Sequence, residues 1–203
     1  MPTRRRRPGL VRVLPWGLLA LALLLPVGLA LREAGGGATV EPLPDYGLVP
    51  EFELTERSGR AIRSAELAGR PWFANFIFTR CQGTCPVLST RMAELRERIG
   101  DDVRLVSFSV DPLHDTPGVL SDYARRLHAP ERQWLFVTGG VAELRALVTD
   151  GFHLSAAESA SGGEITHSDR VALVDGDFRI RRYYLGTEKS WIDEAVRDLA
   201  RLQ

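Results

Sequence analysis

Two cysteines four positions apart are the residues of this sequence best suited to chemistry. Cys81 and Cys85 are its only cysteines, and Pro86 follows directly. The two sulfur atoms can converge as a disulfide, which needs Cα atoms about 4.4–6.8 Å apart, or around one soft metal ion. Gly83 supplies the backbone freedom for that turn. The spacing alone leaves a structural disulfide and a functional pair open.

The cysteines follow a run that predicts a buried strand and precede a run that predicts a helix. Residues 72–78 are almost continuously apolar or aromatic, and from Pro86 to Gly100 apolar residues recur at helical spacing. Ligands commonly bind at such a junction in α/β folds. If Pro86 is the first helical residue, Cys85 lies at the cap, where free amides favour a thiolate. This position favours a functional pair, because a disulfide across so few residues adds little stability.

Four histidines are candidates to complete a metal site: His114, His128, His153 and His167. Two thiolates and one imidazole suit Cu(I) and, with distortion, Cu(II), whereas a structural zinc site takes a fourth protein ligand. His128 at a predicted helix end and His153 at a predicted strand start suit surface or packing roles. His167 precedes a predicted strand, in a loop that can reach another loop, with a solvated loop histidine as the alternative.

The elements that position these residues alternate between strands and helices. Their order, βαβαβα and then ββα, predicts an α/β fold: a thioredoxin-like sandwich with a mixed central sheet flanked by helices. The predicted elements are a β-ribbon at residues 51–55 with its turn at 58–59, strands at 72–78, 103–110, 134–137, 170–174 and 178–185, and helices at 86–99, 116–127, 141–148 and 190–202.

The N-terminal segment predicts export. Arg4 to Arg7 form a basic cluster, and residues 13–31 carry no charge over a length close to the roughly 20 residues that span a bilayer. The positive-inside rule predicts a single-pass transmembrane helix in the cytoplasmic (inner) membrane, with the rest of the chain on the periplasmic, extracytoplasmic side. A cleavable signal peptide with small residues at Gly28 and Ala30 is the alternative, and it also exports the domain.

One globular domain is predicted behind this segment. Residues 1–31 form the basic cluster and the membrane anchor, residues 32–49 are rich in glycine and proline as is typical of a linker, and residues 50–203 form the domain. The chain has 26 basic and 26 acidic residues. Because no summed positive charge attracts a nucleic acid, none is expected as a partner.

Three motifs together resemble the Sco/SenC family of copper proteins, which help to assemble the copper A centre of cytochrome c oxidase. FIFTRCQGTCP is similar to the family's Cys-x3-Cys-Pro motif, VSFSVDPLHDTP to its Asp-Pro-x-x-Asp-Thr signature, and ITHSDRVALVD to its ligand-histidine segment. Asp111 and Asp115 match the acidic signature and are expected to support the site, although turn and helix-cap roles explain them as well. His114 stands at a variable position of that signature and is not assigned to the metal.

The resemblance implies a metallochaperone that binds copper, as Cu(I) and Cu(II), at Cys81, Cys85 and His167. Its partner would be the copper A-bearing subunit of cytochrome c oxidase, with other copper chaperones or thiol reductants as further partners. An enzyme is the alternative, with Cys81 and Cys85 as the catalytic, redox-active pair of a thiol-disulfide oxidoreductase that reduces the cysteines of the oxidase subunit. A third hypothesis is an anchored redox sensor that carries no copper in the cell.

Overall fold

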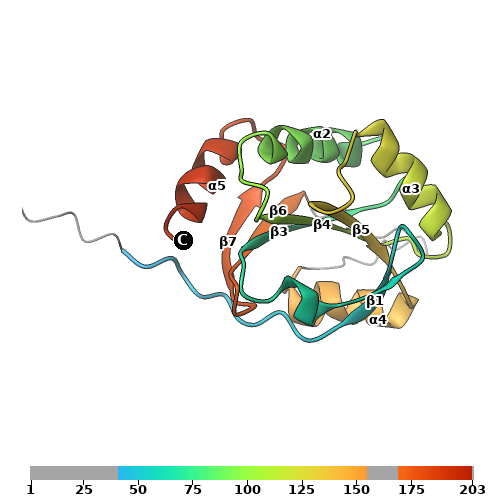
Figure 1. The fold of residues 1–203 in the computed structure, drawn as a ribbon, viewed down its shortest axis with the longest axis horizontal. Helices are drawn as coiled ribbons and strands as arrows, with labels where there is room; N and C mark the ends of the chain where they lie inside the picture. The colour runs from blue at the N-terminus through green and yellow to red at the C-terminus, as the bar shows by residue number, and fades with distance from the viewer. Residues whose placement is uncertain (1–40, 155–168, 203) are drawn as a thin grey trace, which may run out of the picture. The chain divides into compact units, whose positions relative to one another are not determined.

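A seven-stranded mixed β-sheet forms the centre of the domain (Figure 1). The computed structural model describes residues 41–154 and 169–202. Across the sheet the strands lie in the order β2-β1-β5-β4-β3-β6-β7. Their bounds are β1 (Glu53–Glu56), β2 (Ala61–Arg63), β3 (Trp72–Ile77), β4 (Arg104–Ser109), β5 (Trp134–Thr138), β6 (Arg170–Val174) and β7 (Ile180–Leu185).

Three parallel strands make up the middle of this sheet. β3 pairs in parallel with β4, and β4 with β5, whereas β1 and β6 run antiparallel to β5 and β3. β2 and β7 extend the two edges, each antiparallel to its neighbour. The three central strands are buried along almost their whole length, which is why their sequences are mostly apolar runs. The predicted mixed α/β sheet is confirmed.

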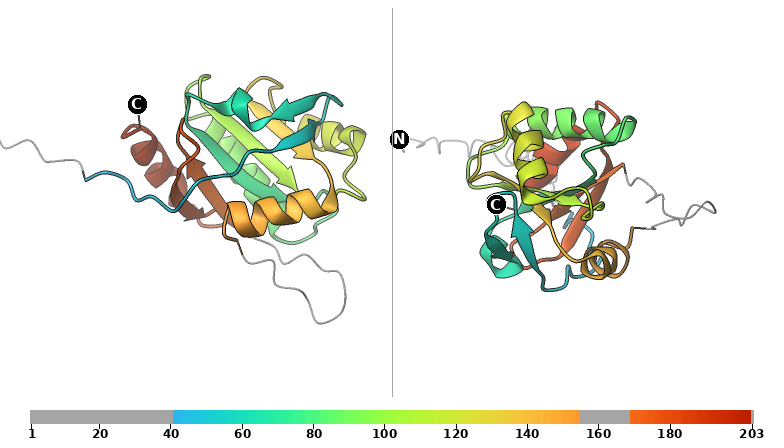
Figure 2. Two further views of the ribbon diagram at one scale, coloured as in Figure 1. Left: turned by 90° about the horizontal axis from the view of Figure 1, so that it is seen from below. Right: turned by 90° about the vertical axis from the view of Figure 1, so that its right-hand side faces the viewer.

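Helices cover both faces of the sheet, and each face has its own apolar core (Figures 1 and 2). The larger helical layer packs on one face through residues such as Leu88, Leu120 and Ile192. The other face is covered through Leu67 and Leu144. The first layer contains α2 (Thr84–Arg96), α3 (Pro117–Arg126) and α5 (Trp191–Leu199), and the second contains the 3-10 helix η1 (Ser64–Leu67), α4 (Val141–Ala146) and its π-helical extension η2 (Leu147–Gly151).

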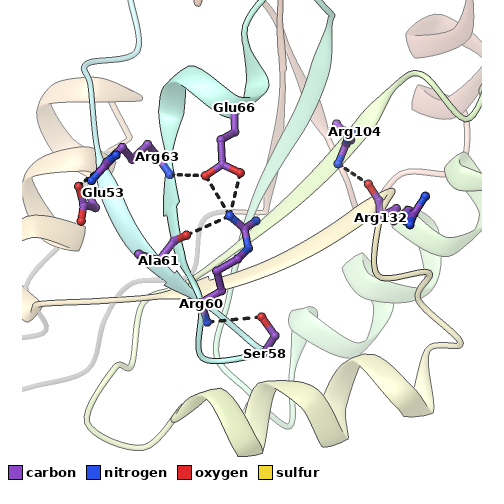
Figure 3. Close-up of polar contacts among 8 residues, drawn as sticks. All are labelled: Glu53, Ser58, Arg60, Ala61, Arg63, Glu66, Arg104 and Arg132. Carbon is purple, nitrogen blue, oxygen red and sulfur yellow. Dashed lines mark hydrogen bonds and ion pairs between the residues drawn. The ribbon is translucent and has the colours of Figure 1, made fainter.

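The β1–β2 hairpin at one edge of the sheet is held by exposed ionic contacts (Figure 3). Glu66 of η1 accepts hydrogen bonds from the Arg60 guanidinium at 2.8 and 3.1 Å and from the Arg63 amide at 3.1 Å. The Arg63 side chain also pairs with Glu53, with 2.7 Å between nitrogen and oxygen. The predicted β-ribbon is therefore confirmed, and η1 stabilises it through these contacts of Glu66.

The described part of the predicted linker packs against β7, so the compact unit begins before residue 50. The Tyr46 amide donates to the Ile180 carbonyl at 2.8 Å, and the Val49 amide donates to the Phe178 carbonyl at 2.9 Å. Leu43 is buried in the core of the larger helical layer. The prolines of this segment cannot donate, but the remaining amides can pair with an edge strand. The compact unit runs from Pro42 to Gln203.

The predicted membrane segment, residues 13–31, lies outside the described residues. Within residues 41–154 and 169–202, none of the helices combines the length and apolar character that crossing a bilayer requires.

Candidate functional site

Both cysteines lie where the chain passes from β3 into α2, at the carboxyl end of the parallel strands. We call residues 79–85 the cysteine turn. No disulfide joins Cys81 and Cys85, and only 8% and 3% of their surface is exposed. The Cys81 amide donates to the Phe78 carbonyl at 3.2 Å, which closes the turn as the chain leaves β3. The predicted strand-to-helix junction is confirmed, and it is an edge where α/β folds bind ligands.

The start of α2 directs backbone amides at the sulfur of Cys81. The Gly83 amide donates to Cys81 Sγ at 3.4 Å. Burial opposes ionisation of Cys81, but hydrogen bonds from the Cys85 amide and thiol and from the Gly83 and Thr84 amides outweigh it. The pKa of the Cys81 thiol therefore lies below its ordinary value. Cys81 is the thiol that ionises first.

Cys85 has the opposite character, which corrects the prediction that it carries the thiolate. Burial raises the pKa of the Cys85 thiol to about 12, and negative charge on Cys81 acts in the same direction. The prediction assumed that Pro86 opens the helix, but α2 begins at Thr84 with Gly83 as its N-cap. The free amides of the first turn therefore surround the cysteine that precedes the helix.

A fully buried carboxylate, Asp115, holds the cysteine turn from the loop between β4 and α3. It accepts hydrogen bonds from the Thr79 hydroxyl at 2.5 Å, the Thr79 amide at 3.1 Å and the Ser109 hydroxyl at 2.7 Å. Thr79 follows β3, and Ser109 is the last residue of β4. One side chain thus joins the exits of two parallel strands, and these donors satisfy a carboxylate that water does not reach.

Asp111 fixes the same region from its exposed side. Its carboxylate accepts a hydrogen bond from Arg80 Nε at 2.7 Å, and its carbonyl accepts the Asp115 amide at 2.9 Å. The Thr116 hydroxyl then caps α3 by accepting from the Val119 amide at 3.5 Å. The two acidic residues of the signature therefore contact the cysteine turn through Thr79 and Arg80.

A buried tyrosine on α3 lies beside the two thiols, and the sequence did not predict it. The Tyr123 and Ser89 hydroxyls are 2.8 Å apart. Burial raises the pKa of Tyr123, the hydrogen bond with Ser89 lowers it, and negative charge on Cys85 and Cys81 raises it again. Ser89 is the residue in the sequence that could have indicated this contact. It follows Cys85 by one helical turn and therefore lies on the same buried face of α2.

His167 falls outside the described residues, so its place beside the thiols stays a prediction. β6 begins at Arg170, and Val171 pairs with Asn75 of β3. Because β3 and β6 are antiparallel, the chain enters β6 at the end of the sheet where β3 leads into the cysteine turn. Within residues 41–154 and 169–202, no three His, Cys, Asp or Glu side chains gather as a metal-binding group.

The other three histidines are exposed. His128, with φ of 51°, closes the last turn of α3 by donating its amide to the Arg125 carbonyl at 3.1 Å, which agrees with its expected role at a helix end. The prediction that His153 starts a strand is wrong, because the helical turn of η2 continues to Gly151 just before it. His114 lies in the loop that carries Asp111 and Asp115.

The family of the chain follows from its match to other proteins. The family model described as SCO1/SenC matches residues 41–202. The chain belongs to the SCO1/SenC family. One relative, the SCO1 protein homolog of Bacillus subtilis (strain 168), is 29% identical over 175 residues, which cover 84% of this chain and 90% of the relative. The resemblance seen in the three sequence motifs is confirmed.

Solved structures of this family share the fold. BsSco, described as a member of the Sco family of cytochrome c oxidase assembly proteins with a disulfide switch, has a TM-score of 0.70 at 28% identity, over 79% of this chain and 95% of its own. Bradyrhizobium japonicum ScoI, solved with copper bound, has a TM-score of 0.64 at 25% identity, over 77% of this chain and 100% of its own. The predicted thioredoxin-like sandwich is confirmed.

Proposed function

We propose that this protein is a copper metallochaperone that holds copper at Cys81, Cys85 and His167 and delivers it to the copper A-bearing subunit of cytochrome c oxidase. The observation that carries the proposal is a pair of buried thiols at the carboxyl edge of the sheet, one with a lowered pKa. Two sulfur donors and an imidazole suit Cu(I) and, with distortion, Cu(II). The copper bound to Bradyrhizobium japonicum ScoI supports copper as the cargo.

The two thiols have unequal parts in copper loading. Cys81 is the first ligand for incoming Cu(I), because backbone amides already stabilise its thiolate. Cys85 keeps its proton until the metal displaces it, because burial holds its pKa at about 12. Binding of Cu(I) by the second sulfur therefore releases a proton from Cys85, and copper affinity rises with pH.

Copper transfer proceeds by association with the acceptor. Three protein ligands leave room for an incoming cysteine or histidine, so copper passes between proteins without being free in solution. The hydrogen bonds of Asp115 to Thr79 and Ser109 hold the cysteine turn in place during this exchange. An acceptor ligand thus meets a sulfur pair whose backbone is already ordered.

A thiol-disulfide oxidoreductase is the second candidate function, favoured by the hydrogen bond from the Cys85 thiol to a low-pKa Cys81. The Cys81 thiolate would attack a disulfide of the oxidase subunit, forming a mixed disulfide and releasing one partner thiolate. Cys85 would then lose its proton to that thiolate and displace the second partner sulfur. The products are a Cys81–Cys85 disulfide and a reduced partner. The disulfide switch described for BsSco supports this chemistry.

Transfer experiments separate the two functions. The full chain in detergent, reduced and loaded with Cu(I), is mixed anaerobically with the reduced, copper-free copper A domain of the oxidase, and copper in each protein is measured after separation. In parallel, the copper-free reduced chain is mixed with the same domain in its disulfide form, and thiols are counted. Copper transfer supports the chaperone. Thiol exchange without copper transfer would instead establish the reductase.

The proposal includes the N-terminal segment as the membrane anchor. Residues 13–31 would cross the inner membrane, residues 32–41 would lead to the compact unit, and that unit would lie in the periplasm. A C-terminal fusion to a reporter that is active only outside the cytoplasm should be active. Activity of a reporter restricted to the cytoplasm would contradict the orientation, and a soluble mature protein that starts near Leu31 would favour the cleaved signal.

A further inference from the structure

Leu113 is the most exposed large apolar side chain in the described part of the chain, with 87% of its surface exposed. One exposed leucine is ordinary on a protein surface. Leu113 differs from the others by its place, because it lies between Asp111 and Asp115 in the loop that leads from β4 to α3. We call residues 111–115 the acidic loop.

Hydrogen bonds connect the acidic loop to the cysteine turn on both sides of Leu113. Two residues before it, the Asp111 carboxylate accepts from Arg80 Nε at 2.7 Å. Two residues after it, the Asp115 carboxylate accepts from the Thr79 amide and hydroxyl. Arg80 and Thr79 directly precede Cys81. Leu113 is thus presented next to the cysteine turn on a loop that is already ordered, so burying it against a partner costs little conformational entropy.

The burial of the thiols makes this surface part of any copper exchange. Cys81 and Cys85 are 8% and 3% exposed, so an acceptor ligand reaches their sulfur atoms only when the acceptor lies directly against the cysteine turn. A folded protein in that position also covers the acidic loop, which the Arg80 and Thr79 contacts hold beside it. Leu113 would therefore be buried in the transfer complex.

The charges around Leu113 favour an apolar contact over an electrostatic one. Asp111 is paired with Arg80, and Asp115 is buried, so neither carboxylate is available to a partner cation. Residues 41–203 carry 20 basic and 25 acidic residues, so the net charge of −5 belongs to the domain as a whole and not to the surface around Leu113. Affinity at this surface then comes from removing apolar area from water.

From these observations we infer that Leu113 is a docking residue for the protein that exchanges copper with Cys81, and that it fits an apolar recess beside that partner's copper ligands. The inference rests on the proposed function, which supplies the partner: the copper A domain of the oxidase. Leu113 acts on encounter with that domain and takes no part in holding copper.

The test compares two exposed leucines. Leu113→Ser removes the proposed contact, and Leu48→Ser is the matched control, because Leu48 is 55% exposed and forms a β-bridge with Arg179 beside the turn between β6 and β7. That turn lies by the start of β3, at the opposite end of the sheet from the cysteines. Each full chain, loaded with Cu(I) in detergent, is mixed with increasing concentrations of the reduced copper A domain, and the rate of copper transfer is followed.

Leu113→Ser should raise the half-saturating concentration of the copper A domain roughly tenfold, the scale of one buried apolar side chain, with the limiting rate and the copper content unchanged. Leu48→Ser should match the wild type. Raising the salt from low to high concentration should change the half-saturating concentration much less than Leu113→Ser does.

Several results would overturn the inference. Equal half-saturation for Leu113→Ser and wild type would remove the docking role while leaving the proposed function intact. A steep salt dependence would show that charge brings the proteins together. If Leu113→Ser instead converts a dimer of the chain to a monomer in sedimentation, the occupant is a second copy. A wild-type chain that transfers no copper at all would sink the proposed function and, with it, the docking role.

Discussion

The β1–β2 hairpin and the cysteine turn are both held by a carboxylate, but the surroundings of the two carboxylates are opposite. Glu66 is exposed and accepts hydrogen bonds from the Arg63 amide and the Arg60 guanidinium, which hold its pKa below the ordinary value. Asp115 is fully buried and accepts from the neutral groups of Thr79 and Ser109. Both make several contacts, so the number of contacts does not rank them.

Burial decides how much each set of hydrogen bonds contributes to stability. Water can replace the partners of Glu66, and solvent screens its attraction to Arg60, so such contacts contribute little. Water does not reach Asp115, whose removal would leave the buried Ser109 hydroxyl and the half-buried donors of Thr79 without this acceptor. The cysteine turn is therefore the region where a single polar side chain controls both the fold and the geometry of the proposed site.

The largest expected effect is on Cu(II) binding, and it compares the histidine proposed to bind copper with the three exposed histidines. His167→Ala should abolish the absorption and paramagnetic resonance signals of stable Cu(II), which needs an imidazole nitrogen, while weak Cu(I) binding by the two thiols remains. The same change at His114, His128 or His153 should leave the Cu(II) spectra nearly unchanged. A wild-type spectrum for His167→Ala together with loss of signal at another histidine would reassign the ligand. If none of the four matters, the oxidoreductase gains support.

The next largest effect is on the free energy of unfolding, and it compares the two carboxylates directly. Asp115→Ala should lower the free energy of unfolding by about 3 kcal/mol, because the buried Ser109 hydroxyl and the half-buried donors of Thr79 lose their acceptor. Glu66→Ala should lower it by about 0.5 kcal/mol, as for other exposed ionic contacts. Urea denaturation of the copper-free protein measures both. Equal losses in the two variants would break the comparison, since burial would then not distinguish the networks.

A smaller effect separates the two thiols within the cysteine turn. In Cys85→Ser, the remaining Cys81 should react with iodoacetamide roughly tenfold faster near pH 7 than Cys85 does in Cys81→Ser. A lowered pKa gives Cys81 more thiolate at a given pH than an ordinary thiol has, and a pKa raised to about 12 keeps Cys85 protonated near pH 7. The rate for Cys81 should level off as pH rises, at a pH where the rate for Cys85 is still increasing. If Cys85 reacted faster than Cys81, the thiolate would instead be assigned to Cys85.

The sequence was informative where the signal is local. The apolar run of β3 and the helical spacing after Pro86 predicted the junction that carries both cysteines. The identity of the thiolate was not predictable in this way, because a proline is accepted throughout the first helical turn and Pro86 does not mark where α2 begins. The helix starts at Thr84, and this shift moves the free amides onto Cys81.

Contacts between distant parts of the chain were also outside the reach of sequence patterns. Asp115 meets Thr79 across 36 positions, and no period in the sequence connects them. The signature marked Asp115 as a supporting residue without indicating what it holds. The segment of residues 43–49 was assigned to a linker from its prolines, and only the edge of β7 shows that its free amides have partners.

Anaerobic titration of the reduced full chain with Cu(I), against Cys81→Ser and Cys85→Ser, tests most directly whether the cysteine turn is a copper site. We expect one tightly bound copper per wild-type chain, because the two thiols are close enough to share a hydrogen bond and can therefore bind the same ion. Either serine variant should lose tight binding. Stoichiometric, undiminished copper in both variants would contradict the assignment of copper to Cys81 and Cys85.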